Sequence, residues 1–259
     1  MRSHFRKNGC VLGICISLFF MSTPLFATCG QGYIGGSVEA AFSHIENSHP
    51  SIRYYDDLLT DFYPANQDNN TKTVLNINGG YEFFGQGYIP AIALGLGIYT
   101  NPTDYHYSGN VNEQASGDPA FLLYNYRYKI RSTRLMAEAK FSWQIKQFIP
   151  YVDIGLGTAW NRLSDYTETA ATIENYVVYP PFQSSTRANF AYQAGFGVGY
   201  AFNFNPCHTG LKYERISLGY RYANAGNVSS GVRNADYPFR LNVGNLSTNS
   251  VYLAYTHLF

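Results

Sequence analysis

The chain has 259 residues, and its 18 lysines and arginines nearly balance its 17 aspartates and glutamates. This balance shows no basic excess of the kind that binds nucleic acid or acidic substrates. Only 14% of the residues are charged, whereas 17% are aromatic and 24 are glycine. Because aromatic residues favour strands while glycine favours turns and close backbone approaches, the composition indicates a β-rich protein.

The N-terminal segment has the organisation of an export signal. Arg2, Arg6 and Lys7 form a basic start, and residues 11–20 form an apolar run without charge. Leu25-Phe26-Ala27 then provides the expected cleavage site. A spanning helix is disfavoured because the apolar run is shorter than the roughly 20 residues that such a helix needs.

We therefore expect a signal peptide over residues 1–27 and a single mature domain over residues 28–259. Cleavage removes three basic groups, which leaves 15 basic residues against 17 acidic ones. The mature domain keeps two cysteines, Cys29 and Cys207. Lipid attachment at Cys29 is disfavoured because the preceding residues match the usual attachment signal poorly. An even pair of cysteines in an exported protein allows one disulfide, which we predict between these two residues.

Eight segments of the mature domain alternate large apolar side chains with small or polar ones. A period of two puts the two sets on opposite faces of a strand. The segments are Gly32–Ser43, Thr73–Phe84, Ile89–Asn101, Arg134–Gln144, Ile149–Trp160, Arg187–Asn203, Leu211–Asn224 and Ser250–Phe259. The third and fifth segments resemble each other, since the pattern of Ile89–Gly97 recurs in Ile149–Gly157.

The small face of these strands decides between two all-β architectures. In a water-soluble sandwich or barrel the face opposite the apolar one is polar, and it has no need of glycine, which weakens strands. Here that face is rich in Gly and Ala. A narrow membrane barrel requires small residues inside, while bulky apolar side chains face lipid. We predict an all-β fold, an eight-stranded antiparallel up-and-down transmembrane β-barrel; a soluble barrel is the alternative.

The connections between the segments alternate in length, as in barrels with short periplasmic turns and long extracellular loops. The short connections are Gly85–Tyr88, Lys146–Phe148 and Phe204–Gly210. The long ones are Ile45–Asn70, Pro102–Phe121, Ser164–Ser185 and Ala225–Leu246. Within this scheme Phe121–Ile130 is strongly β-prone, so we expect it to extend the fourth strand beyond the bilayer.

The last nine residues carry a resemblance to a known family. Val251, Leu253, Tyr255 and the terminal Phe259 put hydrophobic residues at alternating positions, although His257 replaces the usual aromatic residue. This run resembles the closing strand of bacterial outer-membrane proteins, so we expect it to pair with the first strand, around Ile34–Phe42, and to close the barrel. With the export signal and eight strands, the mature chain resembles the small barrels of opacity-type surface antigens and OmpA-like or OmpX-like domains. The resemblance implies the barrel insertion machinery and outer-membrane lipids as partners.

Charged residues on the small face form the main candidate site. They are Glu39, Glu82, Arg134, Glu138, Lys140, Asp153, Arg215 and Arg221. One interpretation is an ion path. The interpretation we favour is a structural plug of paired acids and bases, because an isolated buried charge is very costly and an eight-stranded barrel has room only for side chains.

Other chemistry-bearing residues form no recognisable catalytic or metal site. Ser43-His44 and Ser48-His49 raise the possibility of a lipid-modifying enzyme with a Ser–His–acid group, but solvated histidines are the favoured interpretation. We predict no cofactor and no catalytic residue. The loops contain Tyr54-Tyr55-Asp56-Asp57 and Tyr105-His106-Tyr107, and Tyr with polar neighbours makes adaptable contact surfaces.

The hypothesis from sequence is thus a non-enzymatic outer-membrane barrel, a surface antigen with a structural or adhesive role. A host or surface ligand would bind its long loops. Two alternatives from other classes are a narrow-channel transporter of small apolar solutes and an outer-membrane lipid-modifying enzyme.

Overall fold

The computed structural model describes residues 30–46, 50–54, 59–64, 70–85, 89–115, 118–171, 181–202, 213–233 and 238–259. These residues form one sheet of eleven strands in which every pairing is antiparallel. The strands are β1 (Gly30–Glu46), β2 (Ser51–Tyr54), β3 (Leu59–Phe62), β4 (Asn70–Phe83), β5 (Ala91–Thr100), β6 (Tyr105–Ala115), β7 (Phe121–Ser142), β8 (Phe148–Ala170), β9 (Ser185–Phe202), β10 (Tyr213–Val232) and β11 (Arg240–Leu258). Within the described ranges, no helix has the length and apolar character needed to cross a membrane.

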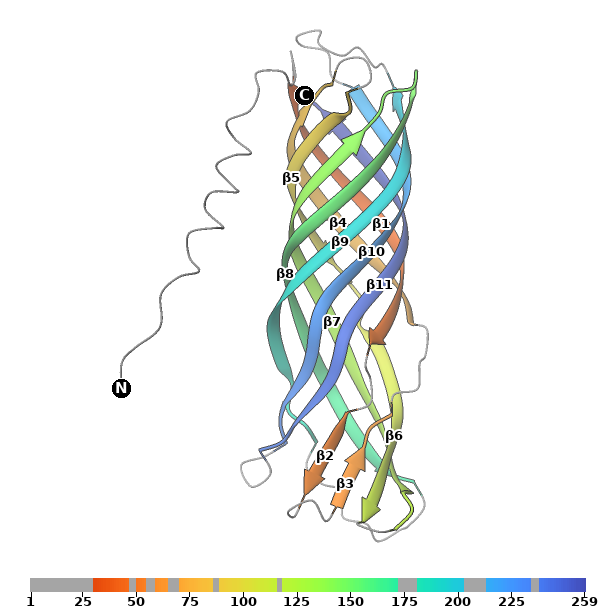
Figure 1. Cartoon of the computed structure of the whole chain (residues 1–259), viewed down its shortest axis with the longest axis vertical. Coiled ribbons are helices and arrows are strands. Elements are labelled where there is room, and N and C mark those ends of the chain that lie inside the picture. The colour runs from red at the N-terminus through yellow and green to blue at the C-terminus, as the bar shows by residue number, and fades with distance from the viewer. Residues whose placement is uncertain are drawn as a thin grey trace, which may run out of the picture.

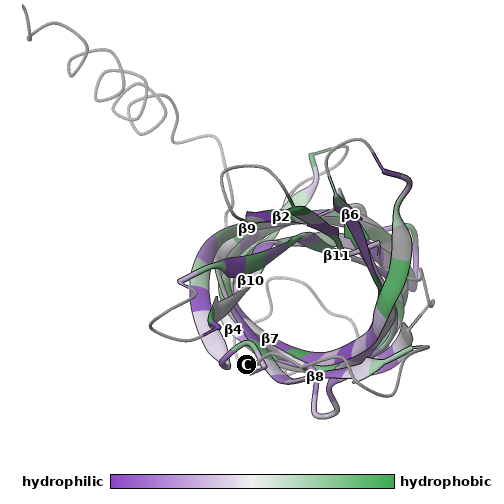
Figure 2. Cartoon of the chain, turned by 90° about the horizontal axis from the view of Figure 1, so that it is seen from below, coloured by the Kyte–Doolittle hydropathy of each residue, from purple (hydrophilic) through white to green (hydrophobic). Residues whose placement is uncertain are grey.

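Eight of these strands close into a ring. The order around it is β1, β4, β5, β7, β8, β9, β10 and β11, since β7 pairs with both β5 and β8 while β1 pairs with both β4 and β11. The ring is visible end-on in Figure 2, and Figure 1 shows its tilted strands from the side. The prediction of an all-β, eight-stranded antiparallel barrel is confirmed.

The ring is completed where the first and last strands meet. The β1–β11 ladder runs from Tyr33 opposite Leu258 to Glu46 opposite Asn245. Beyond it, the backbone N–H of Phe259 donates a hydrogen bond to the carbonyl of Gly32 at 2.9 Å. The final strand therefore pairs with the first, as the sequence predicted, and it leaves no free edge along the ring.

An apolar band surrounds the outside of the ring. The large apolar face of every predicted strand points outward, so that side chains such as Val38, Leu96 and Phe196 are 57–60% exposed. At the end with short turns the band includes Trp143, and toward the other end it includes Trp160. Bulky apolar residues outside and small ones inside are the inverse of a soluble core, and they match a barrel surrounded by lipid.

The described parts of the segments predicted as long loops are largely strands, which corrects that part of the prediction. β8 runs on to Ala170, β10 runs on to Val232 and β11 begins at Arg240, while β2, β3 and β6 add new strands beyond the band. Their buried inward residues include apolar side chains, with Leu241 0% and Val243 1% exposed, and polar ones such as Ser230, which is 0% exposed. Because polar residues occupy both faces of these strands, the sequence shows little apolar alternation there.

We call the part of the barrel beyond the apolar band the extension; it comprises β2, β3, β6 and the adjoining ends of β1, β7, β8, β9, β10 and β11, with residues 181–184 (Figure 1). The first half of β7 pairs with β6 and its second half with β5, so β6 continues the wall where β5 ends. The expected extension of the fourth barrel strand through Phe121–Ile130 is therefore confirmed. In contrast, Tyr105 and Tyr107 do not lie in an exposed loop, since their side chains are 1% and 4% exposed.

The closure can be tested by a disulfide across the β1–β11 ladder. Val38 and Leu253 are register partners, whereas Val251 pairs with Ala40. In a background with Cys29 and Cys207 changed to serine, we expect Val38→Cys/Leu253→Cys to lose its free thiols on oxidation, because directly opposed Cβ atoms are close enough to bridge.

The matched control is Val38→Cys/Val251→Cys, in which the two thiols are out of register. Thiol titration of the denatured protein distinguishes the two variants. Equal cross-linking of both variants, or of neither, would contradict the stated register.

Candidate functional site

All eight charged residues predicted for the small face lie on the inward side of the barrel strands: Glu39 on β1, Glu82 on β4, Arg134, Glu138 and Lys140 on β7, Asp153 on β8, and Arg215 and Arg221 on β10. Glycine makes the space for them. A Cβ on Gly195 would lie 2.9 Å from a carboxylate oxygen of Asp153, and one on Gly97 would lie 3.1 Å from the Glu138 carboxylate. Small residues on this face thus accommodate charged ones.

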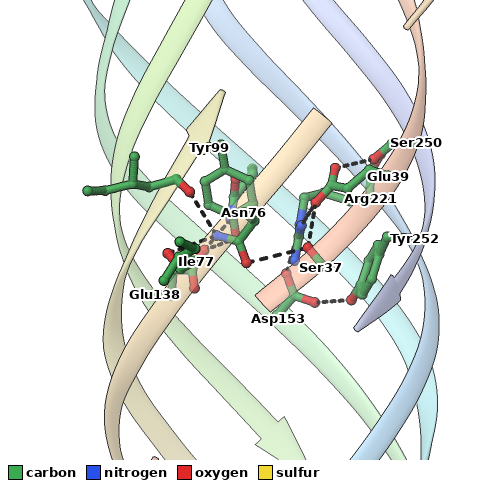
Figure 3. Close-up of polar contacts among 12 residues, drawn as sticks. Ser37, Glu39, Asn76, Ile77, Tyr99, Glu138, Asp153, Arg221, Ser250 and Tyr252 are labelled. Carbon is green, nitrogen blue, oxygen red and sulfur yellow. Dashed lines mark hydrogen bonds and ion pairs between the residues drawn. The ribbon is translucent and has the colours of Figure 1, made fainter. Parts of the chain in front are cut away.

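Arg221 is the centre of the largest group of contacts (Figure 3). Its guanidinium forms an ion pair with Glu39, and its Nε lies 3.6 Å from Asp153 Oδ1. Ser250 donates a hydrogen bond to Glu39 at 2.9 Å, and the hydroxyl of Tyr252 donates one to Asp153 at 3.2 Å. One arginine therefore joins acids from β1 and β8, and side chains of β11 hold those acids in place.

A second ion pair lies closer to the short-turn end. Arg215 donates two hydrogen bonds to the two carboxylate oxygens of Glu82, at 3.1 and 3.2 Å, and both side chains are 2% exposed. Such a bidentate geometry is the strong form of an arginine–carboxylate contact. Because both charges are removed from solvent, each depends on the other for compensation of its charge.

The remaining predicted charges contact polar aromatic groups. Glu138 accepts hydrogen bonds from the hydroxyl of Tyr99 and, at 2.7 Å, from the side-chain amide of Gln193. The guanidinium of Arg134 lies 5.0 Å from the centre of the Tyr99 ring. The ammonium of Lys140 lies over another tyrosine ring at 4.7 Å. Cations over aromatic faces are stabilised by the charge distribution of the ring.

The predicted charges of the interior balance one another, and the cavity beside them is small. Four acids stand against four bases in the predicted set. The cavity bordered by Glu138, Lys140, Asp153, Arg215 and Arg221 has a volume of about 20 Å³. This volume is close to the minimum that holds one water molecule. The arrangement favours the interpretation as a structural plug over that as an ion path.

Sequence reasoning missed the uncharged partners of these charges. Tyr99, Gln193, Ser250 and Tyr252 all contact charged members of the predicted set. A signal for them existed, because each falls on the small face of its strand by alternation. Their hydroxyl and amide groups carry no formal charge, so a prediction based on charge does not include them.

The extension has an interior of its own, made of aromatic rings. Tyr107, Tyr128, Tyr126 and Tyr166 form a stacked row, with successive ring centres 5.6, 5.9 and 6.1 Å apart. Phe182 meets Tyr166 edge-on at 5.0 Å. These contacts join β6, β7, β8 and the segment before β9. Such aromatic pairs add stability beyond their buried area, so the extension is a packed structure.

A buried acidic group lies next to this aromatic row. Asp61 on β3 is 5% exposed and is the register partner of Glu113 on β6. Burial, and then the Glu113 carboxylate, raise the pKa of Asp61 to about 7. Burial also raises the pKa of Glu168, although that carboxylate forms an ion pair with Arg233 and accepts a hydrogen bond from a tyrosine. The β2–β3 hairpin thus pairs with β6 beside Asp61, a buried acid whose raised pKa disfavours its ionised form.

Three candidate pairs from the sequence, Cys29–Cys207, Ser43–His44 and Ser48–His49, have separate outcomes, and the last of them lies outside the described residues. Cys29 and Cys207 lie outside the described residues, so their disulfide stays a prediction. Ser43 is buried and accepts a hydrogen bond from Tyr107, whereas the adjacent His44 lies on the outward face of β1. Within the described part of the chain, no group of three His, Cys, Asp or Glu side chains could hold a metal ion.

A closed ring with an apolar exterior and a packed polar interior defines the class of membrane-spanning β-barrels. The model of the outer membrane protein beta-barrel domain family matches residues 13–253. The chain belongs to this family of bacterial outer-membrane proteins. In barrels of this class the short turns face the periplasm and the longer connections face the outside of the cell.

The individual proteins that resemble this chain match only part of it or share little sequence identity with it. Outer membrane protein PagN of Salmonella typhimurium is 30% identical over 152 residues, which are 58% of this chain and 56% of PagN. The match thus spans little more than half of the length of that relative. Similar solved structures include Neisserial surface protein A, with a TM-score of 0.45, and Ail of Yersinia pestis, with a TM-score of 0.40. Each is 12% identical, and each alignment covers 89% of this chain and 99% of the solved chain.

The Glu82–Arg215 pair yields a test of the plug. Reversing one charge, in Arg215→Glu, puts two buried carboxylates together, so we expect the free energy of unfolding to fall by about 3–5 kcal/mol. The double variant Glu82→Arg/Arg215→Glu should recover most of this loss, because the pair is restored with its signs exchanged. Urea unfolding in lipid, followed by tryptophan fluorescence, measures both, with the exposed Arg240→Glu as the control. Additive effects of the two reversals would contradict pairing.

The raised pKa of Asp61 predicts a pH-dependent extension. An acid whose pKa is higher in the folded than in the unfolded state binds its proton more tightly when folded, so stability falls as the pH rises between the two values. The docked hairpin should therefore lose stability from about pH 4, the usual aspartate value, to about pH 7 and change little above that.

Hydrogen exchange of β2 and β3 at pH 5.5 and pH 8 measures this change. We expect greater protection at pH 5.5, and in Asp61→Asn the difference between the two values should largely disappear. An unchanged pH response in that variant would show that another group is responsible.

Proposed function

We propose that this protein is a non-enzymatic contact protein of the cell surface, whose extension presents its connecting loops to a macromolecular ligand outside the cell. The observation that carries the proposal is the extension itself. Strands β7, β8, β10 and β11 continue past the apolar band without interruption, and the aromatic row gives the projecting part its own packed interior. A barrel that served only as a membrane anchor would need neither.

The two alternative functions receive less support. Transport of small apolar solutes requires an apolar path, whereas buried ion pairs such as Glu82–Arg215 fill the interior. A lipid-modifying enzyme requires a serine and a histidine on one side of the wall. Ser43 and His44 lie on opposite sides of β1, so this pair is a poor candidate for such chemistry.

The proposed function also requires that the protein be exported and inserted into the outer membrane. We propose that residues 1–27, which lie outside the described part, direct export and are removed, leaving 28–259 as the barrel domain. The barrel insertion machinery would then recognise β11, whose outward residues Val251, Leu253 and Tyr255 are 46–57% exposed and form an apolar row that ends near Phe259.

The contact function can be tested with fluorescent vesicles that carry the purified protein. Residues 55–58, 116–117, 172–180 and 234–237 connect strands of the extension, and each segment is replaced in turn by a Gly-Ser segment of equal length. We expect at least one replacement to lower vesicle binding to matrix-coated surfaces or cultured cells to the level of empty vesicles. The matched control replaces residues 203–212 except Cys207, which connect β9 and β10 at the periplasmic end.

Retention of full binding by all four replacements, singly and combined, would reject the contact function. Equal loss in the periplasmic control would indicate a defect in folding instead. Circular dichroism of each variant identifies such a defect.

A further inference from the structure

The outer surface of the extension carries a concentration of positive charge on one side. On the outward face of β7, Arg127, Lys129 and Arg131 follow one another at every second position. The adjacent strands add Arg162 on β8 and His106 on β6, both exposed. We call these five residues the basic strip. Two carboxylates lie against it: Asp104, 2.7 Å from Arg131, and Asp165, 2.8 Å from Lys129. The four arginine and lysine side chains of the strip thus outnumber the two acids beside it.

The placement of two arginines in the basic strip is unfavourable for folding alone. Arg131 and Arg162 are register partners on β7 and β8, so both side chains leave the same face of the wall at directly opposed positions. Like charges in such a position destabilise a sheet. The ion pair with Asp104 accounts for one guanidinium, and it is exposed on the arginine side. An anion bound between the two arginines would turn this repulsion into attraction.

A groove continues outward from these arginines. It has a volume of about 500 Å³, and Lys129, Arg127, His106, Ser108 and Thr167 are among the residues that line it. Its floor is shaped by a bulge in β8, where the pairing shifts between Arg127 and Lys129. Bulges of this kind redirect side chains away from the regular ladder. The groove therefore offers two cations, of which Lys129 is paired with Asp165, and several hydroxyl and ring groups next to the opposed arginines.

The position of the basic strip indicates where its ligand comes from. Arg162 follows Trp160, the outward aromatic residue at the border of the apolar band, by two residues, or about 7 Å along the strand. Arg131 is four residues beyond the exposed Leu135, about 13 Å along the strand and about 10 Å along the membrane normal at the usual tilt. Both guanidiniums thus lie at the level of the lipid headgroups, which begin where the hydrocarbon ends.

We propose that the basic strip binds the phosphate groups of a phosphorylated glycolipid of the surrounding outer leaflet. Arg131 and Arg162 hold a phosphate at headgroup level, and the groove around Lys129 and Arg127 receives the attached sugar. The acyl chains lie on the apolar surface beside Trp160 and Leu135. Because the basic strip adjoins the apolar band, a lipid is favoured over a soluble sulfated or phosphorylated glycan. Such a glycan has no acyl chains that could contact the apolar surface. The inference is independent of the proposed contact function at the loops.

The two tryptophans of the chain provide a local measurement, because they lie at opposite ends of the band. Trp143→Phe leaves Trp160 as the reporter beside the basic strip, and Trp160→Phe leaves Trp143 as the reporter at the periplasmic end. The protein is placed in phosphatidylcholine nanodiscs containing a few per cent of dansyl-labelled bisphosphorylated lipid A. Energy transfer from each tryptophan to dansyl then reports the local concentration of the glycolipid.

We expect greater transfer from Trp160 than from Trp143, and no difference when the lipid A has lost its phosphates. Adding Arg131→Gln and Arg162→Gln should reduce the enrichment at Trp160 by about fivefold or more, because each basic residue near an anionic surface contributes about that factor. Arg131→Lys/Arg162→Lys should retain most of the enrichment. Arg240→Gln, which removes an exposed arginine on β11, serves as the matched control and should change nothing.

Three results would overturn the proposal. Equal transfer from both tryptophans would show that the lipid has no preferred site at the basic strip. Equal enrichment of the dephosphorylated lipid would show that phosphate is not recognised. Unchanged enrichment in the glutamine variant, together with its loss of binding to soluble dextran sulfate, would assign the strip to a soluble glycan. Circular dichroism establishes that the variants are folded, so that reduced transfer is attributed to the strip.

Discussion

Each backbone polar group at the depth of the apolar band must find its partner in a neighbouring strand, because lipid offers none. The β1–β11 ladder completes this condition, since it joins the first strand of the described chain to the last. Closure also fixes the diameter. A ring of eight strands leaves an interior that side chains alone can fill, and the composition of the inward face follows from this limit.

The paired charges of the interior are a consequence of the small diameter of the eight-stranded ring. Glycines at positions such as Gly195 make space, and the space is taken by ion pairs and by the tyrosines that contact them. Arg221 illustrates the result, because it contacts acids of two strands while its guanidinium lies 4.4 Å from the centre of the Tyr252 ring. Removing one member would leave its partner charged and buried, which costs more than the pair gains. The plug is therefore best regarded as one unit.

Much of the barrel could be predicted from sequence, because a period of two is a local property. The eight strands, the inward charges and the pairing of the last strand with the first all followed from alternation and strand count. The extension did not. Leu241 and Val243 are buried only because β6, β8 and the β2–β3 hairpin enclose them together with β11, and this arrangement depends on contacts distant in sequence. Asp61 was not predicted for the same reason, because its raised pKa results from burial and then from an opposed carboxylate on another strand.

The continuity of β7 has a mechanical consequence. Its 22 residues belong to the extension at one end and to the barrel at the other, with no turn between them. A load applied to the outer connections along the barrel axis therefore acts nearly parallel to the strands. Interstrand hydrogen bonds lie perpendicular to strands, so such a load shears many of them at once and does not peel them one by one. The extension should thus behave as a stiff rod that transmits force directly to the part of the barrel embedded in lipid.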